Sequence, residues 1–251
     1  MKIVAMTALG IGGATVVGSL LGFLFQKIPH KWNDAIMGFA AGVMLAAAII
    51  GLILPAAEMV NRSGIWIIGL GLLVGAIFLN LMDKVTPHLH HISGVDEEEH
   101  KNNHNLNKVL LFVMAIGIHN LPEGLAAGMA FGGQDIGNAL AVAAGIALQN
   151  IPEGMIIISP MLLAGIKKRR TFLIALSTGL VEVVGTFIGY FAVNLAGAIL
   201  PFALSFAGGT MLYVVGDEMI PETHSHGYER MATYSLIIGF FVMLLMDFLI
   251  G

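Results

Sequence analysis

Long apolar stretches alternate with short polar segments along this chain. Eight of them approach or exceed the ~18 residues at which an apolar segment is read as a membrane-spanning helix, and none shows the two-residue alternation of a membrane β-strand. The pattern therefore predicts an all-α membrane protein of eight transmembrane helices, forming a single transmembrane domain over residues 1–251. The expected helices are 3–25, 34–59, 64–83, 108–131, 136–163, 171–194, 201–221 and 231–250.

Composition supports lipid as the solvent. Of the 251 residues, 57% are hydrophobic and only 11% are charged, whereas a soluble domain carries roughly 25% charged residues. The chain has no cysteine, which excludes disulfides and thiolate metal sites. A net charge of −4 gives no reason to expect nucleic-acid binding.

The basic residues predict an orientation. Ten of the twelve lysines and arginines fall in the first, third, fifth and seventh connections, and only Lys2 and Arg62 fall on the opposite side. Because cytoplasmic connections are enriched in lysine and arginine, we expect both termini outside and the odd-numbered connections in the cytoplasm.

The chain resembles itself after a shift of 167 positions. Since the matching helices are an odd number of crossings apart, the two copies would run in opposite senses, as the inverted repeats of transporters do. Glycine-rich apolar helices can also resemble one another by chance, which is the alternative for these segments. The matches at this shift are 16–18 with 183–185 and 39–45 with 206–212. Residues 67–69 agree only weakly with 237–239, at a shift of 170.

A closer repeat lies in the middle of the chain. Residues 119–124 (HNLPEG) recur thirty positions later as residues 149–154 (QNIPEG), and chance does not account for a six-residue motif with four identical positions. Adjacent membrane helices are antiparallel, so this pair is inverted as well. The sequence therefore predicts a 3+2+3 inverted-repeat bundle.

The repeated motif carries metal-binding chemistry. Side chains four positions apart share one helix face, so His119 and Glu123 lie together, with Asn120 bordering them. The second copy repeats this face with Gln149, Asn150 and Glu153. Two such faces opposed would offer an imidazole, two carboxylates and amide oxygens, a mixed set that suits Zn²⁺, Fe²⁺, Mn²⁺ or Cd²⁺. The alternative is that these polar residues only bond helices together.

Charge counting favours a divalent ion at this motif. An ionised carboxylate inside a bilayer is costly unless it is paired, and no lysine or arginine lies within the two expected central helices, 108–131 and 136–163, beyond Lys108 at the cytoplasmic boundary. Glu123 and Glu153 together offset the charge of one M²⁺. Without metal they must be protonated or hydrated, so transport should depend on pH.

Further candidates lie outside the motif. Glu182, an intramembrane carboxylate, is expected to be an additional ligand, and Met44 could offer a thioether, although most of the 15 methionines must serve packing. A second group could contact metal at the cytoplasmic helix ends or in the histidine-rich connection at about 84–107. Its members are His88, His90, His91, Glu218, Glu222 and His224.

These motifs closely resemble those of the ZIP (Zrt-, Irt-like) family of metal transporters, particularly its GufA-like bacterial branch. The resemblance implies a homodimer in the bacterial inner membrane, metal movement into the cytoplasm, and an elevator in which helices one, four, five and six slide against the rest. It implies a binuclear centre bridged by Glu153. The first site would comprise His119, Glu123, Gln149, Glu153 and Met44, and the second Asn120, Asn150, Glu153 and Glu182.

Two positions depart from the family pattern. Many members have His where this chain has Gln149, and some have Asp where it has Asn150. Losing an imidazole and a charge should weaken binding and broaden selectivity among metals.

The expected function is therefore carriage of divalent transition metals, zinc foremost and with Fe, Mn or Cd as further cargo, with no prosthetic group. Two alternatives stay open: a channel through the same site, and an intramembrane metallohydrolase. The hydrolase is disfavoured because an inverted pair of sites has no evident use in an enzyme and no H-E-x-x-H motif is present.

Overall fold

The molecule is a bundle of long helices. The computed structural model describes residues 1–25, 28–92, 104–133, 135–195 and 197–251, and only the backbone of 85–92, 104–112 and 115. Helices account for nearly all of this described part, which contains no strand. The helices are α1 (Lys2–Leu24), α2 (His30–Ala46), α3 (Leu54–Glu58), α4 (Ile65–Ile92), α5 (His104–Ala130), α6 (Ile136–Leu163), α7 (Lys168–Leu195), α8 (Leu200–Val214), α9 (Ile220–Thr223) and α10 (Glu229–Ile250).

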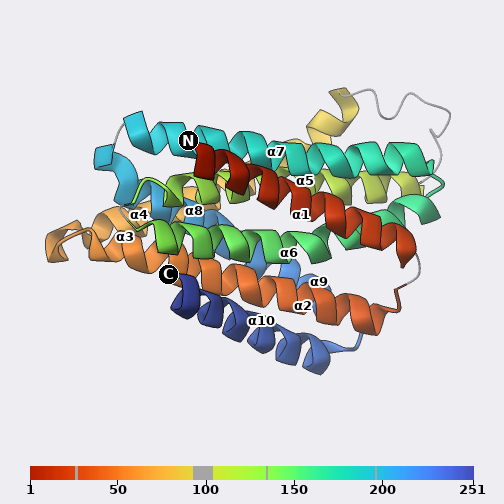
Figure 1. Ribbon diagram of the computed structural model, residues 1–251. Coiled ribbons are helices and arrows are strands. Elements are labelled where there is room, and N and C mark those ends of the chain that lie inside the picture. The colour runs from red at the N-terminus through yellow and green to blue at the C-terminus, as the bar shows by residue number, and fades with distance from the viewer. Residues whose placement is uncertain (26–27, 93–103, 134, 196) are drawn as a thin grey trace.

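Seven helical segments in the described part are long and apolar enough to cross a membrane. They are 2–24, 30–58, 62–84, 136–163, 168–195, 197–223 and 229–250. The eighth expected span corresponds to α5, which is not among the seven but lies alongside α7 in the same bundle (Figure 1). The two ends of the chain lie at the same end of the bundle (Figure 1).

The surface of the bundle is apolar. Trp66 and Leu73 of α4 and Phe248 of α10 are 81%, 65% and 83% exposed. The interior instead buries Asp34, Glu123 and other polar side chains. This inside-out arrangement suits lipid, because hydrocarbon solvates large apolar side chains and penalises polar ones.

Two segments of the membrane-spanning part of the chain form π-helical turns. Residues Ala47–Ile53 join α2 to α3, and Val215–Met219 join α8 to α9. In both cases the second residue of the next helix is a proline, Pro55 in α3 and Pro221 in α9. π-helical turns are rare and occur frequently at functional sites, and the second of these carries Glu218.

Glycines set the closest helix approaches. A Cβ at Gly124 of α5 would lie 2.3 Å from the carbonyl oxygen of Glu182, and one at Gly154 of α6 would lie 2.3 Å from that of Thr15. Gly12 and Gly179 face each other in the same way. A Cβ at Gly12 would lie 2.5 Å from the carbonyl oxygen of Gly179, and one at Gly179 would lie 2.7 Å from that of Gly12. Only glycine permits such backbone contact between membrane helices.

The packing of α4 and α10 follows a different register from the sequence match between them. A Cβ at Gly239 would lie 2.1 Å from the carbonyl oxygen of Phe39, and one at Gly75 would lie 2.2 Å from that of Phe206, whereas Gly69 has nothing within 4 Å. Gly75, and not Gly69, is therefore the counterpart of Gly239 in packing. The weak sequence match of 67–69 with 237–239 therefore does not coincide with these packing contacts.

Two other expectations concern helix ends. Helix α4 continues to Ile92 instead of ending near residue 83, and α5 begins at His104 instead of 108. Polar and histidine-rich residues thus extend these helices where a longer connection was expected. The side chains of His88, His90 and His91 lie outside the described residues.

Candidate metal centre

The paired motif lies inside the bundle, on the facing middle parts of α5 and α6. Both helices continue through the motif prolines, Pro122 and Pro152. All six polar motif side chains are buried, with exposed fractions between 0% and 7%: His119, Asn120, Glu123, Gln149, Asn150 and Glu153.

Glu182 of α7 joins the two motif copies. Its carboxylate is fully buried and accepts hydrogen bonds from the side-chain amides of Asn120 and Asn150, the latter at 2.7 Å. The hydroxyl of Thr15 on α1 contacts both carboxylate oxygens at 3.1 Å. Four helices therefore converge on this one carboxylate.

Several oxygens of the motif have no hydrogen-bond partner among the described residues. They are both carboxylate oxygens of Glu123, the side-chain oxygen of Gln149, and the Oδ1 atoms of Asn120 and Asn150. A buried acceptor without a partner costs about 1–3 kcal/mol, and five together are not a stable arrangement for packing alone. Because all five are oxygen ligands, a bound cation would satisfy them.

A second group of ligand atoms adjoins the motif. Nε2 of His119 lies 2.8 Å from a carboxylate oxygen of Glu218 and 3.5 Å from one of Asp83. The three ligand atoms lie within 4.8 Å of one another, and the short contact to Glu218 is not aligned as a hydrogen bond. Glu218 was a sequence candidate. Asp83 was missed, because the sequence placed it at a helix end, where a polar residue is ordinary.

A cavity of about 380 Å³ reaches this region. His119, Glu123 and Glu153 line its inner part, and Glu218 and Glu222 line it toward α9. The remaining lining side chains are Met37, Ile116, Ile156, Val214, Asp217, Met219 and Pro221. We call this the inner cavity, and its lining extends from the buried motif to α9.

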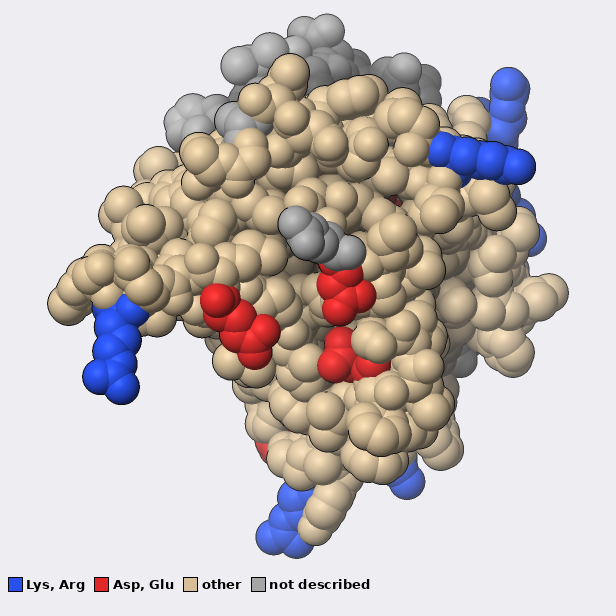
Figure 2. Space-filling model, turned by 60° about the vertical axis from the view of Figure 1, so that its left-hand side comes forward, with Lys and Arg blue, Asp and Glu red and all other residues tan. Residues whose placement is uncertain are grey.

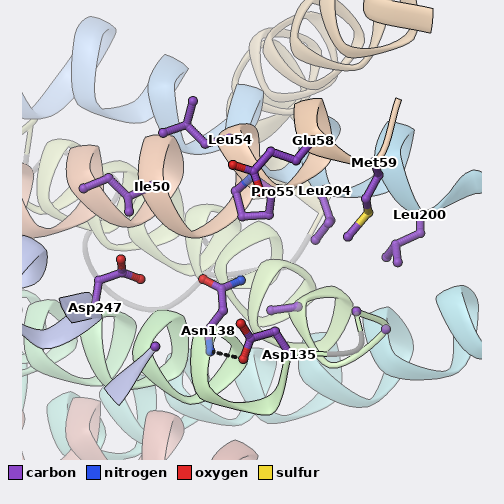
Figure 3. A pocket seen from close by; sticks show the side chains of 14 residues that line it. Ile50, Leu54, Pro55, Glu58, Met59, Asp135, Asn138, Leu200, Leu204 and Asp247 are labelled. Atoms are coloured by element: carbon purple, nitrogen blue, oxygen red, sulfur yellow. Dashed lines mark hydrogen bonds between the residues drawn. The ribbon is translucent and has the colours of Figure 1, made fainter. Parts of the chain in front are cut away.

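A second cavity, of about 710 Å³, lies at the end of the bundle that carries the termini. We call it the outer cavity. Glu58 and Met59 face it from above and Asp135, Asn138 and Asp247 from below (Figure 3). Figure 2 shows acidic side chains near the middle of this face, with lysine and arginine side chains toward the edges. No residue of the paired motif lines this cavity.

Two sequence candidates lie apart from these cavities. Met44 is 1% exposed and belongs to the apolar core, on the helix that packs against α6. The ring of His224 is engaged locally: Nδ1 lies 2.8 Å from the carbonyl oxygen of Ile220 and Nε2 lies 3.2 Å from the hydroxyl of Thr233. His224 therefore caps α9 and does not line the inner cavity.

The chain is similar to known zinc transporters. The model of the ZIP zinc transporter family matches residues 93–247. Zinc transporter GufA of Myxococcus xanthus is 37% identical over 246 residues, covering 96% of both chains. Zinc transporter ZIPB of Bordetella bronchiseptica is 35% identical over 248 residues, covering 95% of this chain and 78% of the relative. Zinc transporter ZupT of Streptococcus mutans is 32% identical over 249 residues, covering 95% and 93%.

These matches confirm the resemblance that the repeated motif predicted, including its GufA-like character. With the apolar helices, they identify a multi-pass membrane protein. The chain belongs to the ZIP zinc transporter family.

Proposed function

We propose that this protein carries divalent transition-metal ions, zinc foremost, across the membrane into the cytoplasm through the site on α5 and α6. Membership of the ZIP family makes the chain a transporter and not an enzyme. The observation that carries the proposal is the buried, unpartnered carboxylate of Glu123, which lies beside a cavity also lined by Glu153 and His119. An acid in this position is stable when a dication neutralises it.

The ligand atoms fall into two groups, which supports a binuclear centre. His119, Glu123 and Glu153 line the inner cavity, and we assign them with Gln149 to the first site, with Met44 as a further candidate ligand. Asn120 and Asn150 flank Glu182 at a deeper position, and we assign these three to the second site, with Glu153 as the bridge. Since Gln149 and Asn150 are uncharged, we expect selectivity broader than zinc, extending to Fe²⁺, Mn²⁺ and Cd²⁺.

The two cavities suggest how the site is reached. The inner cavity contacts the motif residues, and the outer cavity does not. This is what alternating access requires of a conformation open to one side. Of the ten basic residues in the described part of the chain, all but Lys2 and Arg62 lie toward the helix ends on the α9 side, so we place that end in the cytoplasm and both termini outside.

The packing also supports the 3+2+3 inverted repeat. The contacts of Gly124 with Glu182 and of Gly154 with Thr15 are equivalent under shifts of 30 and 167 positions. Two residue pairs contact their own counterparts: Gly12 with Gly179, and Thr15 with Glu182. Such pairs would lie at the axis that relates the two halves.

The most extensive helix contacts join α5 with α7, α1 with both α6 and α7, α2 with α10, and α4 with α8. We therefore propose a carrier of α1, α5, α6 and α7 that slides against a scaffold of α2, α4, α8 and α10. From the family resemblance we further propose a homodimer in the bacterial inner membrane, with loose capture of cytoplasmic metal by the histidines near residues 88–91.

Uptake into liposomes tests the function directly. Vesicles that enclose a zinc-sensitive dye should show saturable Zn²⁺ uptake with the purified protein. Glu123→Ala and Glu153→Ala should each abolish it, because each removes one of the two charges that offset the dication. Glu229→Ala changes an exposed glutamate on α10 and should leave uptake intact.

The outcomes separate the alternatives. Flux that rises without saturation indicates a channel, and an absence of flux accompanied by peptide cleavage indicates a hydrolase. Wild-type uptake by both glutamate variants would remove the basis for the site assignment. Size-exclusion profiles of the variants show whether a loss of uptake reflects the site and not the fold.

A further inference from the structure

An apolar groove opens on the surface of the bundle where α1 ends and α2 begins. Its volume is about 540 Å³, and every side chain that lines it is hydrophobic. Leu24 and Phe25 line it at the end of α1, Trp32 and Ile36 from α2, and Met155 from α6. Both α1 and α2 pack against α6, so the groove separates them next to α6.

Large apolar side chains of the groove are left uncovered by the described part of the chain. Leu24 is 74% exposed, Phe25 58% and Trp32 55%. They lie at the end of the bundle opposite the two chain termini (Figure 1), where two membrane-spanning segments end. Tryptophan is enriched at this depth, where hydrocarbon meets the headgroups. The groove is therefore open to the acyl chains of one leaflet, close to their headgroups.

The rim of the groove is positively charged. The segment 25–33 contains Lys27 and Lys31 and no acidic residue, and the next acid along the chain, Asp34, is fully buried. Lys31 is exposed, and its Nζ lies 5.7 Å from the centre of the Trp32 ring, within reach of a cation–π contact. No carboxylate among the described residues pairs with it. The N-terminus of α2, which has no acidic residue in its first turn, adds to the positive potential.

We propose that this groove binds an anionic phospholipid, with one acyl chain along the hydrophobic walls and the phosphate at Lys31. The walls offer the chain an apolar surface to bury, and the unpaired lysine attracts the phosphate. A zwitterionic lipid fits the walls equally well, but the same positive charge repels the amine of its headgroup. The charge at the rim therefore determines which lipid is bound.

The groove also lies on the boundary between the two parts of the proposed elevator. Leu24 and Met155 belong to α1 and α6 of the carrier, whereas Trp32 and Ile36 belong to α2 of the scaffold. A lipid in the groove would contact both parts, so the composition of the leaflet would influence how easily they slide. Lipid binding itself does not depend on transport, whereas this consequence rests on the proposed function.

Tryptophan fluorescence tests the site without a transport assay. The chain has two tryptophans, so Trp66→Phe leaves Trp32 as the single probe. This variant is reconstituted in phosphatidylcholine vesicles that contain either phosphatidylglycerol or phosphatidylcholine with brominated acyl chains, which quench tryptophan on contact. We expect half-maximal quenching at about one-fifth of the mole fraction for brominated phosphatidylglycerol, because one lysine near the surface favours anionic lipid about fivefold.

Three variants in the Trp66→Phe background complete the test. Lys31→Gln should remove the preference for phosphatidylglycerol. Lys2→Gln changes an exposed lysine at the other end of α1 and should keep it, which makes it the matched control. Ile36→Phe narrows the groove and should reduce quenching by both brominated lipids. Each comparison is made between the two lipids within one variant, so a change in the intrinsic fluorescence of Trp32 cancels.

Three outcomes would overturn the proposal. Equal quenching by the two lipids, or a preference that Lys31→Gln leaves unchanged, would show that the rim does not select an anionic headgroup. Quenching by neither lipid would show that a second copy of the chain or another protein covers Trp32. A full preference in Ile36→Phe would show that headgroups gather at the surface while no acyl chain occupies the groove. None of these outcomes bears on whether the central site carries zinc.

Discussion

The two halves of the bundle resemble each other in backbone packing much more than in side-chain chemistry. A Cβ at Gly18 of α1 would lie 2.1 Å from the carbonyl oxygen of Ile151, and one at Gly185 of α7 would lie 2.7 Å from that of Leu121. These contacts correspond under the same shifts that relate the sequence motifs. Close helix approach is therefore repeated almost position by position.

The chemistry at equivalent positions differs. Where α1 has Thr15, α7 has Glu182, and these two side chains contact each other. Where α5 has His119, α6 has Gln149. The two halves therefore repeat the helix packing, but the carboxylate of Glu182 and the imidazole of His119 each occur in one half only. We infer that the packing positions two helices of opposite direction and that the unpaired side chains determine which ion is bound and where.

Among the variants that test this difference, removal of the Glu182 carboxylate should lower zinc uptake the most. Glu182→Ala takes away the acceptor shared by Asn120, Asn150 and Thr15, and the loss of a carboxylate that ligates metal or orients its ligands lowers activity about 10–100-fold. Thr15→Ala removes one donor and leaves the carboxylate, so its loss should be smaller. Initial rates of zinc uptake in liposomes measure both.

Equal losses for the two variants would contradict this asymmetry between the halves. Glu182→Gln helps to interpret the result, since it keeps the shape and removes the charge. Uptake near wild type in Glu182→Gln would mean that the carboxylate serves packing and not metal binding.

Adding a methyl group at equivalent glycines of the two halves should destabilise the protein to a similar extent. Gly18→Ala and Gly185→Ala each push a Cβ against a backbone carbonyl, and overpacking of this kind costs about 1–3 kcal/mol. We expect both to lower the thermal unfolding temperature in detergent. Gly10→Ala is the matched control on α1, since nothing lies within 4 Å of its Cβ. A shift for Gly10→Ala as large as for the other two would show that the close contacts do not set stability.

Much of the fold could be predicted from the sequence because lipid imposes simple rules on span length and polarity. The register of the last helix pair could not, since Gly69 and Gly75 look alike in an apolar stretch and only the contact of Gly75 with Phe206 distinguishes them. The π-helical turns at Ala47–Ile53 and Val215–Met219 were also missed, because their hydrogen-bond shift leaves no residue pattern.

The motif faces of α5 and α6 could be predicted because four-residue spacing places His119 and Glu123 on one side of a helix. Residues that join them from distant helix ends could not. Asp83 looked like an ordinary helix terminus, although one of its carboxylate oxygens lies 3.5 Å from Nε2 of His119. Among the histidines near α9, the sequence favoured His224, whose ring is engaged in capping.

The smallest expected effect comes from making the two motif copies alike. Gln149→His gives α6 the imidazole that α5 already has, and because nitrogen ligands favour Zn²⁺ over Mn²⁺ more than amide oxygen does, the Zn²⁺/Mn²⁺ preference should rise by about fivefold, roughly 1 kcal/mol. His119→Gln should shift the preference in the opposite direction. Competition between the two ions in the liposome assay measures both variants. An unchanged ratio in each would mean that neither ring nor amide contacts the transported ion, and that selectivity arises from the carboxylates common to both halves.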